Sequence, residues 1–329
     1  MLPSSPAPGS PGNLSSVTEQ ALMTERPGTR PPQAPLKPRT PVSFRKRIVT
    51  IVIIAISVVW TAWIFFASSP GSDWRPFGVS NGYQVYLGDY WTLFTSMFVH
   101  VNALHLYFNA YWIWILGGWV EERYGARFYA LLVVISGFCA SALELSFAGG
   151  TGVGLSGVVY AIFGLLWGAQ LFGSHSTDEV LPAQRIQLFL VWLVLCFVLT
   201  ATGALSIGNV AHVTGLVVGV LAAFAVASPQ RVIARVAVPL AVLVSGITVL
   251  YSPWSFVWLG SKAIRAQMSG QFDVAVHYYS AVIERRPNDP WPLENRGRIQ
   301  VFLGHTAEGK ADIDRAELER KAPGQIPHF

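Results

Sequence analysis

The feature that most constrains this chain is a series of apolar stretches, each near the length that crosses a bilayer. A transmembrane helix needs about 20 consecutive, mainly apolar residues, because the hydrocarbon core is about 30 Å thick. Only 12% of the 329 residues are charged, whereas soluble domains carry about a quarter. Seven stretches qualify, at about residues 48–67, 103–119, 128–147, 153–172, 186–205, 207–227 and 236–258. The chain is therefore predicted to be an all-α, polytopic membrane helical bundle.

Composition divides the chain into four parts. Residues 1–44 are rich in Pro, Ser, Gly and Thr, and such a segment buries too little apolar surface to offset its ordering entropy. We expect a disordered Pro-rich tail there. A core of six transmembrane helices is predicted for residues 45–228, a seventh transmembrane helix for 229–258, and a small helical-repeat domain for 259–329.

Positive charges in the short loops predict the orientation. Lys and Arg favour the cytoplasmic side of a membrane, and one orientation places almost all of them there; they are Arg45, Lys46, Arg47, Arg123, Arg127, Arg185, Arg231 and Arg235. We expect a plasma-membrane protein of a bacterium, with a cytoplasmic N-terminus and the C-terminal part outside.

The long outer loop, from Ser68 to about Val99, is rich in aromatic residues, among them Tyr83, Tyr86 and Trp91. Amphipathic rings favour the headgroup level of a bilayer. The loop is therefore predicted to lie partly in the outer leaflet; an ordinary folded loop with buried aromatic side chains is the alternative.

The C-terminal part repeats with a period of 34 residues. Gly270, Phe272, Ala275, Tyr279, Val282 and Pro287 correspond to Gly304, Thr306, Gly309, Ile313, Ala316 and Lys321. This period and pattern resemble tetratricopeptide repeats, although independent repeat arrays usually need three copies. We expect a small helical module that either binds a protein partner or serves as a structural cap.

A few polar side chains interrupt the apolar stretches. An ionisable side chain within a bilayer costs about 2.5–3.5 kcal/mol even on lenient scales, so each requires a reason. The predicted topology brings them toward the same outer side; they are His100, His105, Asn109, Glu144, Ser156 and His212. Taken singly, each could simply hydrogen-bond its own or a neighbouring helix. Their common depth favours a functional site.

Small residues predict which helices meet at this site. Ala211, Gly215, Gly219 and Ala223 form one row, and Gly157, Ala161, Gly164 and Gly168 form another. Such rows let helix backbones approach closely in lipid. If the two helices pack together, the Ser156 hydroxyl and the His212 imidazole come within hydrogen-bonding distance. Tyr160, one turn from Ser156, is then placed to stack on the imidazole.

A metal site is the alternative use of the histidines. His100 and His105 are five residues apart, which is not the i, i+4 pair of a helical zinc site, and no HExxH motif is present. We therefore predict neither a metal nor another cofactor.

Four separated motifs resemble those of the rhomboid intramembrane serine proteases. They are Gly154-Leu155-Ser156-Gly157, Ala211-His212-x-x-Gly215, His100-x4-His105-x3-Asn109 and Gly117-Gly118-x-x-Glu121. The resemblance covers about residues 48–227 and implies a six-helix core that cleaves transmembrane protein substrates in a hydrated cavity near the outer leaflet. No basic patch interleaved with aromatic residues appears in the sequence, so we expect no nucleic-acid partner.

The resemblance also implies roles for individual residues. Ser156 would attack a backbone carbonyl, and His212 would take its proton. His105, Asn109 and the backbone N–H of Ser156 would hold the oxyanion, with Tyr160, Gly154, Gly157, His100 and Gly215 in support. No Asp lies between Asp89 and Asp178 or between Asp178 and Asp273, so a third carboxylate is hard to find for His212 and a dyad is expected.

One departure from the family pattern concerns the outer loop. Rhomboids commonly have a Trp-Arg pair whose Arg binds the Glu after the second span, but here Trp91 is followed by Thr92. Glu121 therefore lacks its expected partner, which leaves the packing of the loop open.

Two other functions remain as alternatives. An inactive relative could bind transmembrane clients while its C-terminal repeats recruit a partner, but such proteins typically lose the Ser or the His, and both are present here. A transporter would be expected to show an inverted repeat or a pair of broken helices, and neither is visible.

Overall fold

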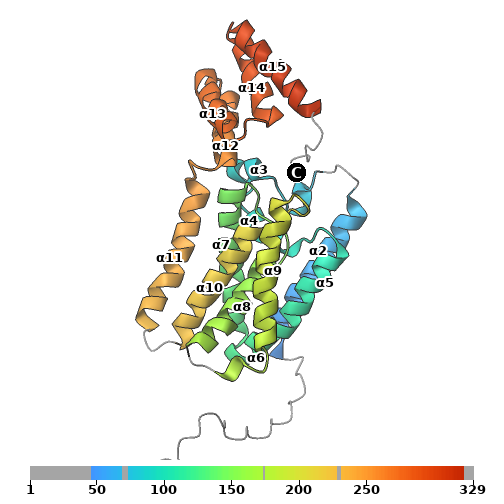
Figure 1. Ribbon diagram of the computed structural model, residues 1–329, viewed down its shortest axis with the longest axis vertical. Helices are drawn as coiled ribbons and strands as arrows, with labels where there is room; N and C mark the ends of the chain where they lie inside the picture. The colour runs from blue at the N-terminus through green and yellow to red at the C-terminus, as the bar shows by residue number, and fades with distance from the viewer. Residues whose placement is uncertain (1–45, 69–72, 173–174, 228–230, 322–329) are drawn as a thin grey trace, which may run out of the picture. The chain divides into compact units, whose positions relative to one another are not determined.

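The computed structural model describes residues 46–68, 73–172, 175–227 and 231–321, and every regular element in these segments is helical (Figure 1). The membrane part consists of α2 (Ile48–Ala67), α5 (Ala103–Trp112), η4 (Ile113–Gly117), α6 (Gly118–Tyr124), α7 (Ala126–Ala148), α8 (Ser156–Leu171), α9 (Ala183–Ala201), α10 (Asn209–Ala227) and α11 (Arg231–Leu250). The predicted N-terminal tail lies outside the described residues.

Helix length and hydropathy confirm an all-α, polytopic membrane protein. Four helices are long and apolar enough to cross a bilayer, namely α2, α7, α9 and most of α10. Helix α8 and residues 235–250 of α11 are apolar but shorter. The remaining predicted span corresponds to α5, the π-helical turn η4 and α6, which follow one another from Ala103 to Tyr124.

Two of the predicted spans are too long. The seventh, predicted as residues 236–258, is not continuous, because α11 ends at Leu250 and a new helix begins at Phe256. Pro253 lies in the break, and proline has no N–H with which to continue a helix. The fifth span ends at Ala201 rather than near Leu205, and Gly203 follows with φ +71°.

Helices α8 and α10 pack backbone against backbone at the centre of the bundle, side by side as Figure 1 shows. The contact uses both predicted rows of small residues. A Cβ added to Gly215 would overlap the carbonyl oxygen of Gly157, and one added to Gly219 would overlap that of Ala161. The predicted packing of these two helices is confirmed.

Glu121 has a partner that the sequence does not reveal. Its carboxylate accepts hydrogen bonds from the backbone N–H groups of Val49 and Thr50, both at 2.8 Å, and from the Thr50 hydroxyl at 2.8 Å. These N–H groups belong to the first turn of α2, where no intrahelical acceptor exists and negative charge is favoured. Glu121 therefore caps α2 and needs no arginine.

The outer loop contains η2 (Arg75–Phe77), α3 (Gly82–Leu87), α4 (Thr92–Thr95) and η3 (Ser96–Phe98). Arg75 donates to Asp89 through Nε at 2.9 Å, and the Ser80 hydroxyl donates to the same carboxylate at 2.8 Å. Of the aromatic residues in this loop, Tyr86 is buried whereas Trp91 is 52% exposed, and the position of the loop in the outer leaflet stays a prediction.

The C-terminal part consists of α12 (Phe256–Met268), α13 (Phe272–Arg285), α14 (Pro290–Phe302) and α15 (Thr306–Lys321). Helix α14 begins 34 residues after α12, and α15 begins 34 residues after α13. Gly270 and Gly304 occupy the equivalent turns, with φ of +73° and +90°. The helices thus follow the period read from the sequence, while their assignment as tetratricopeptide repeats stays a prediction.

The C-terminal helices are fixed to the outer loop through α12 and α3. Arg265 of α12 donates a 2.6 Å hydrogen bond from Nη2 to the carbonyl oxygen of Tyr86. The Tyr83 ring packs on Trp291 with centroids 4.6 Å apart. Burial raises the pKa of the Tyr83 phenol, because the charged form would lose its hydration there.

Candidate active site

Ser156 and His212 meet at the N-terminal ends of two helices. Ser156 is the first residue of α8, and His212 lies in the first turn of α10. His212 Nε2 is 2.8 Å from Ser156 Oγ, which is the hydrogen-bonded geometry that an activated serine requires. The two side chains are 56 residues apart in sequence. Their predicted proximity is confirmed.

The start of α10 is held in place by Glu144, a residue to which the sequence alone assigns no role. Glu144 lies near the end of α7, is 6% exposed, and accepts a 2.8 Å hydrogen bond from the backbone N–H of Ala211. A carboxylate at a helix N-terminus satisfies an otherwise unpaired donor and is favoured by the helix dipole. Glu144 therefore positions the turn that carries His212. The feature of the sequence that pointed to Glu144 was its predicted depth in the membrane, which is the same as that predicted for Ser156.

The imidazole of His212 is oriented by stacking. The rings of Tyr160 and His212 lie 4.7 Å apart and are tilted by 31°, which confirms the predicted contact. The Tyr160 hydroxyl donates to the carbonyl oxygen of Phe189 on α9 at 3.1 Å. Among the described residues, His212 Nδ1 has no hydrogen-bond partner. Among these residues, therefore, no carboxylate bonds to His212.

His100 holds the segment that leads into α8. Its Nδ1 lies 3.2 Å from the carbonyl oxygen of Phe98, and its Nε2 accepts from the backbone N–H of Leu155 at 3.4 Å. The first contact requires a proton on Nδ1 and the second a free pair on Nε2, so this geometry assigns a neutral ring. His100 therefore supports Ser156 through the residue that precedes it.

His105 lies beside this segment. Its ring is 4.9 Å from that of His100, centroid to centroid. Gly154 has φ +95°, and a Cβ added there would lie 2.6 Å from His105 Cε1. Only glycine suits both the backbone conformation and this approach. The nitrogen His105 Nδ1 is buried without a partner among the described residues.

Asn109 is less clearly placed for its predicted role. It is buried, and its amide donates to the carbonyl oxygen of His105, one turn earlier on the same helix, at 2.9 Å. Side-chain amides readily form such local bonds. An Asn109 that served the oxyanion would use its second N–H or leave this bond.

Backbone donors are available next to the Ser156 hydroxyl. The first N–H groups of an α-helix have no intrahelical acceptor and point toward its N-terminus, and Ser156 begins α8. Such a terminus stabilises negative charge. The arrangement thus combines a nucleophile, a base and an anion-stabilising backbone, which is the set that acyl transfer needs.

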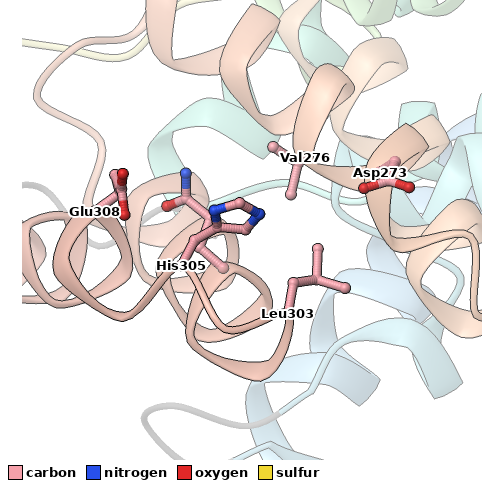
Figure 2. A pocket seen from close by; sticks show the side chains of 6 residues that line it. Asp273, Val276, Leu303, His305 and Glu308 are labelled. Carbon is pink, nitrogen blue, oxygen red and sulfur yellow. The ribbon is translucent and has the colours of Figure 1, made fainter.

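A cavity of about 270 Å³ lies apart from the dyad, among the C-terminal helices (Figure 2). Asp273 and Val276 of α13 line one side of it, and Leu303, His305 and Glu308 line the other. None of these residues belongs to the predicted active site.

Comparisons with known proteins match the membrane part of the chain. Residues 87–229 match the family model described as the Rhomboid domain. A rhomboid protease GlpG of Enterobacter sp. (strain 638) is 36% identical over 177 residues, which are 53% of this chain and 59% of that relative. A rhomboid protease GlpG of Salmonella paratyphi A is 34% identical over 178 residues, which are 53% of this chain and 61% of the relative. The chain thus spans about three-fifths of the length of these curated relatives.

Proposed function

The chain carries a rhomboid domain over residues 87–229, and from this premise we propose that it is an intramembrane serine endopeptidase of transmembrane proteins. The observation that carries the proposal is the 2.8 Å contact between Ser156 Oγ and His212 Nε2. Both residues lie within the matched segment, and the GlpG relatives are named as rhomboid proteases.

In the proposed reaction, Ser156 Oγ attacks a backbone carbonyl carbon of the substrate while His212 Nε2 takes the hydroxyl proton. The tetrahedral intermediate then collapses, and His212 returns the proton to the leaving amine. Water next attacks the acyl-enzyme, again with His212 as base, and restores Ser156. Stacking on Tyr160 keeps the imidazole in line with the hydroxyl during both proton transfers.

We assign the oxyanion to three donors, the backbone N–H of Ser156 and the side chains of His105 and Asn109. The position of Ser156 at the start of α8 supports the first of these. Loss of one such donor costs about 2.7–4 kcal/mol of transition-state stabilisation in soluble proteases. The second is supported by His105 Nδ1, which is buried and has no hydrogen-bond partner in the part of the chain that the structure describes.

The length of α8 supports a reaction below the outer surface of the membrane. Its 16 residues span about 24 Å at 1.5 Å per residue, less than the hydrocarbon core of about 30 Å. We infer that a helix this short, if its other end lies at the opposite membrane boundary, carries the Ser156 hydroxyl below the outer boundary. Water must then reach it through the outer side, in a hydrated cavity.

Substrate is proposed to enter past α9. Of the 19 residues in this helix, only Phe189 and Cys196 are buried, so fewer side chains hold α9 in the bundle than hold α8, most of which is buried. A substrate segment must also unwind, because an intact helix hides its carbonyl groups in its own hydrogen bonds. Substrates with helix-breaking residues near the outer boundary are therefore favoured.

The proposed topology has a cytoplasmic N-terminus and an outer C-terminal module, which acts as a tetratricopeptide-like platform for a protein partner or as a cap. A periplasmic or extracellular reporter fused after Phe329 is expected to be active, and a cytoplasmic reporter at the same place inactive. The opposite pair of results would reverse the orientation.

The proposed activity is tested with a fluorophosphonate probe on the purified protein in liposomes. Such probes react with serines that a base activates, so we expect one labelled site, which mass spectrometry maps to the peptide containing Ser156. In the same liposomes, a model single-span protein with a helix-breaking segment near its outer boundary should be cleaved. Labelling at other serines only, together with an intact substrate, would exclude the proposal.

A further inference from the structure

A second cavity lies where the seventh membrane helix ends and the C-terminal helices begin. It measures about 170 Å³, and its lining includes Tyr86 of α3, Leu250 of α11, and Trp258, Lys262 and Arg265 of α12. It uses none of the residues assigned to proteolysis. Its position at the outer end of a membrane helix is where lipid headgroups are found.

The charged side chains of this cavity are both cationic. Lys262 and Arg265 are three residues apart on α12, so they share one face of that helix. Lys262 Nζ lies 5.0 Å from the centroid of the Trp258 ring, and Arg265 uses Nη2 for its bond to Tyr86. The guanidinium has five N–H donors in all, so donors remain for an anion. No acidic residue is among those that line the cavity.

Tyr86 adds no negative charge to the lining. Burial raises the pKa of its phenol, because the phenolate would lose its hydration, and the ring therefore stays neutral at physiological pH. An anion that enters the cavity meets two cations and neutral groups. The ammonium of a zwitterionic headgroup would find no carboxylate among the lining residues. It could not bind over the Trp258 ring either, because Lys262 occupies that position.

An apolar strip leads from the cavity along α11. Leu240, Leu243, Ile247 and Leu250 are 53%, 59%, 49% and 74% exposed. Their spacing of three and four residues places them on one side of the helix. Beyond the end of the helix, Tyr251 is 58% exposed, as expected for an aromatic residue at the headgroup level. An acyl chain that follows this strip brings its phosphate to the cavity.

We propose that this cavity binds the phosphate of an anionic phospholipid, with Lys262 and Arg265 as its ligands and the acyl chains along the exposed side of α11. Arg forms directional, paired hydrogen bonds with phosphate oxygens, and Lys contributes a point charge. The ligand is a lipid rather than free phosphate because the apolar strip continues from the cationic face. The bound lipid would join α11, α12 and α3, which all contribute to the cavity.

The test measures the first lipid-binding constant of the full-length protein by native mass spectrometry in detergent. Phosphatidylglycerol, phosphatidylcholine and soluble glycerol 3-phosphate are compared. We expect phosphatidylglycerol to bind most tightly. Lys262→Gln should weaken it about fivefold, since each basic residue near an anionic headgroup contributes roughly that factor. The double variant Lys262→Gln, Arg265→Gln should weaken it about 25-fold.

Lys310→Gln provides the matched control, because Lys310 is an exposed lysine on α15 that does not line the cavity. It should bind phosphatidylglycerol as the unchanged protein does. Arg265→Gln also removes the bond to Tyr86, so Lys262→Gln alone decides the matter if the double variant unfolds. Three results would each overturn the proposal: equal binding of phosphatidylcholine, wild-type binding by Lys262→Gln, or glycerol 3-phosphate binding as tightly as the lipid. None of them bears on proteolysis.

Discussion

Ser156→Ala is expected to lower kcat/KM for cleavage of a transmembrane substrate by at least about 10⁴-fold, since removal of a catalytic serine costs up to about 10⁶-fold in a soluble serine protease. The reason is chemical, because the substitution removes the oxygen that lies 2.8 Å from His212 Nε2. His212→Ala should cause a loss of the same order, and the double variant should be little worse, since the two groups act as a unit. The measurement is the rate of product formation in liposomes at matched protein content.

Ser136→Ala is the matched control for this variant. Ser136 is a buried serine of α7 whose hydroxyl donates to the carbonyl oxygen of Val133 at 3.4 Å rather than to Ser156 or His212. Its loss should leave the rate within about threefold, as expected for one weak local hydrogen bond. If Ser156→Ala cleaves as fast as Ser136→Ala, the assignment of Ser156 is wrong and another nucleophile must be sought.

Gly215→Ala should damage both stability and activity, although it adds only one methyl group. That methyl group would overlap the carbonyl oxygen of Gly157, and a backbone atom cannot turn aside as a side chain can. Overpacking costs about 1–3 kcal/mol, occasionally more, so a clear fall of Tm is expected. Because Gly157 adjoins Ser156, the helices should also separate at the dyad, and a displacement of 1 Å costs about 100-fold in rate.

The comparison for this second variant is Gly246→Ala on α11. A Cβ at Gly246 would meet nothing within 4 Å, and alanine is the better helix former. Its Tm should therefore be unchanged or slightly higher, with full activity. Thermal unfolding in detergent and the cleavage assay measure both effects. Equal Tm values for the two variants would contradict the close packing of α8 on α10.

The sequence was sufficient to predict the centre of the molecule. Small residues at spacings of three and four on two apolar stretches favour a close helix contact, and in the structure Gly215 lies against Gly157. Polar groups in an apolar stretch are costly, which made Ser156 and His212 conspicuous. The rows of small residues and the buried polar groups are both strong signals, because few other arrangements are stable within a bilayer.

The partners of the buried carboxylates could not be predicted in this way. Glu144 and Glu121 each accept hydrogen bonds from the backbone at the start of another helix, and backbone N–H groups have no sequence signature. The expectation that Glu121 pairs with an arginine came from the family pattern, which concerns side chains. The break between α11 and α12 was missed for a related reason, because the apolar composition continues through Tyr251 and Trp254 while Pro253 ends the helix.

Arg265, Tyr83 and Tyr86 fasten α12 to α3, and this has a mechanical consequence for the proposed protease. A Cβ added to Gly260 would overlap the Tyr83 ring, so α12 and α3 are closely packed at this point. The first half of the outer loop therefore packs against the C-terminal helices. We expect α3 and α12 to move together. We expect α9 to be displaced more easily than α3, because most of its residues are not buried. Entry of a substrate helix past α9, as proposed, would therefore leave the contact between α12 and α3 intact.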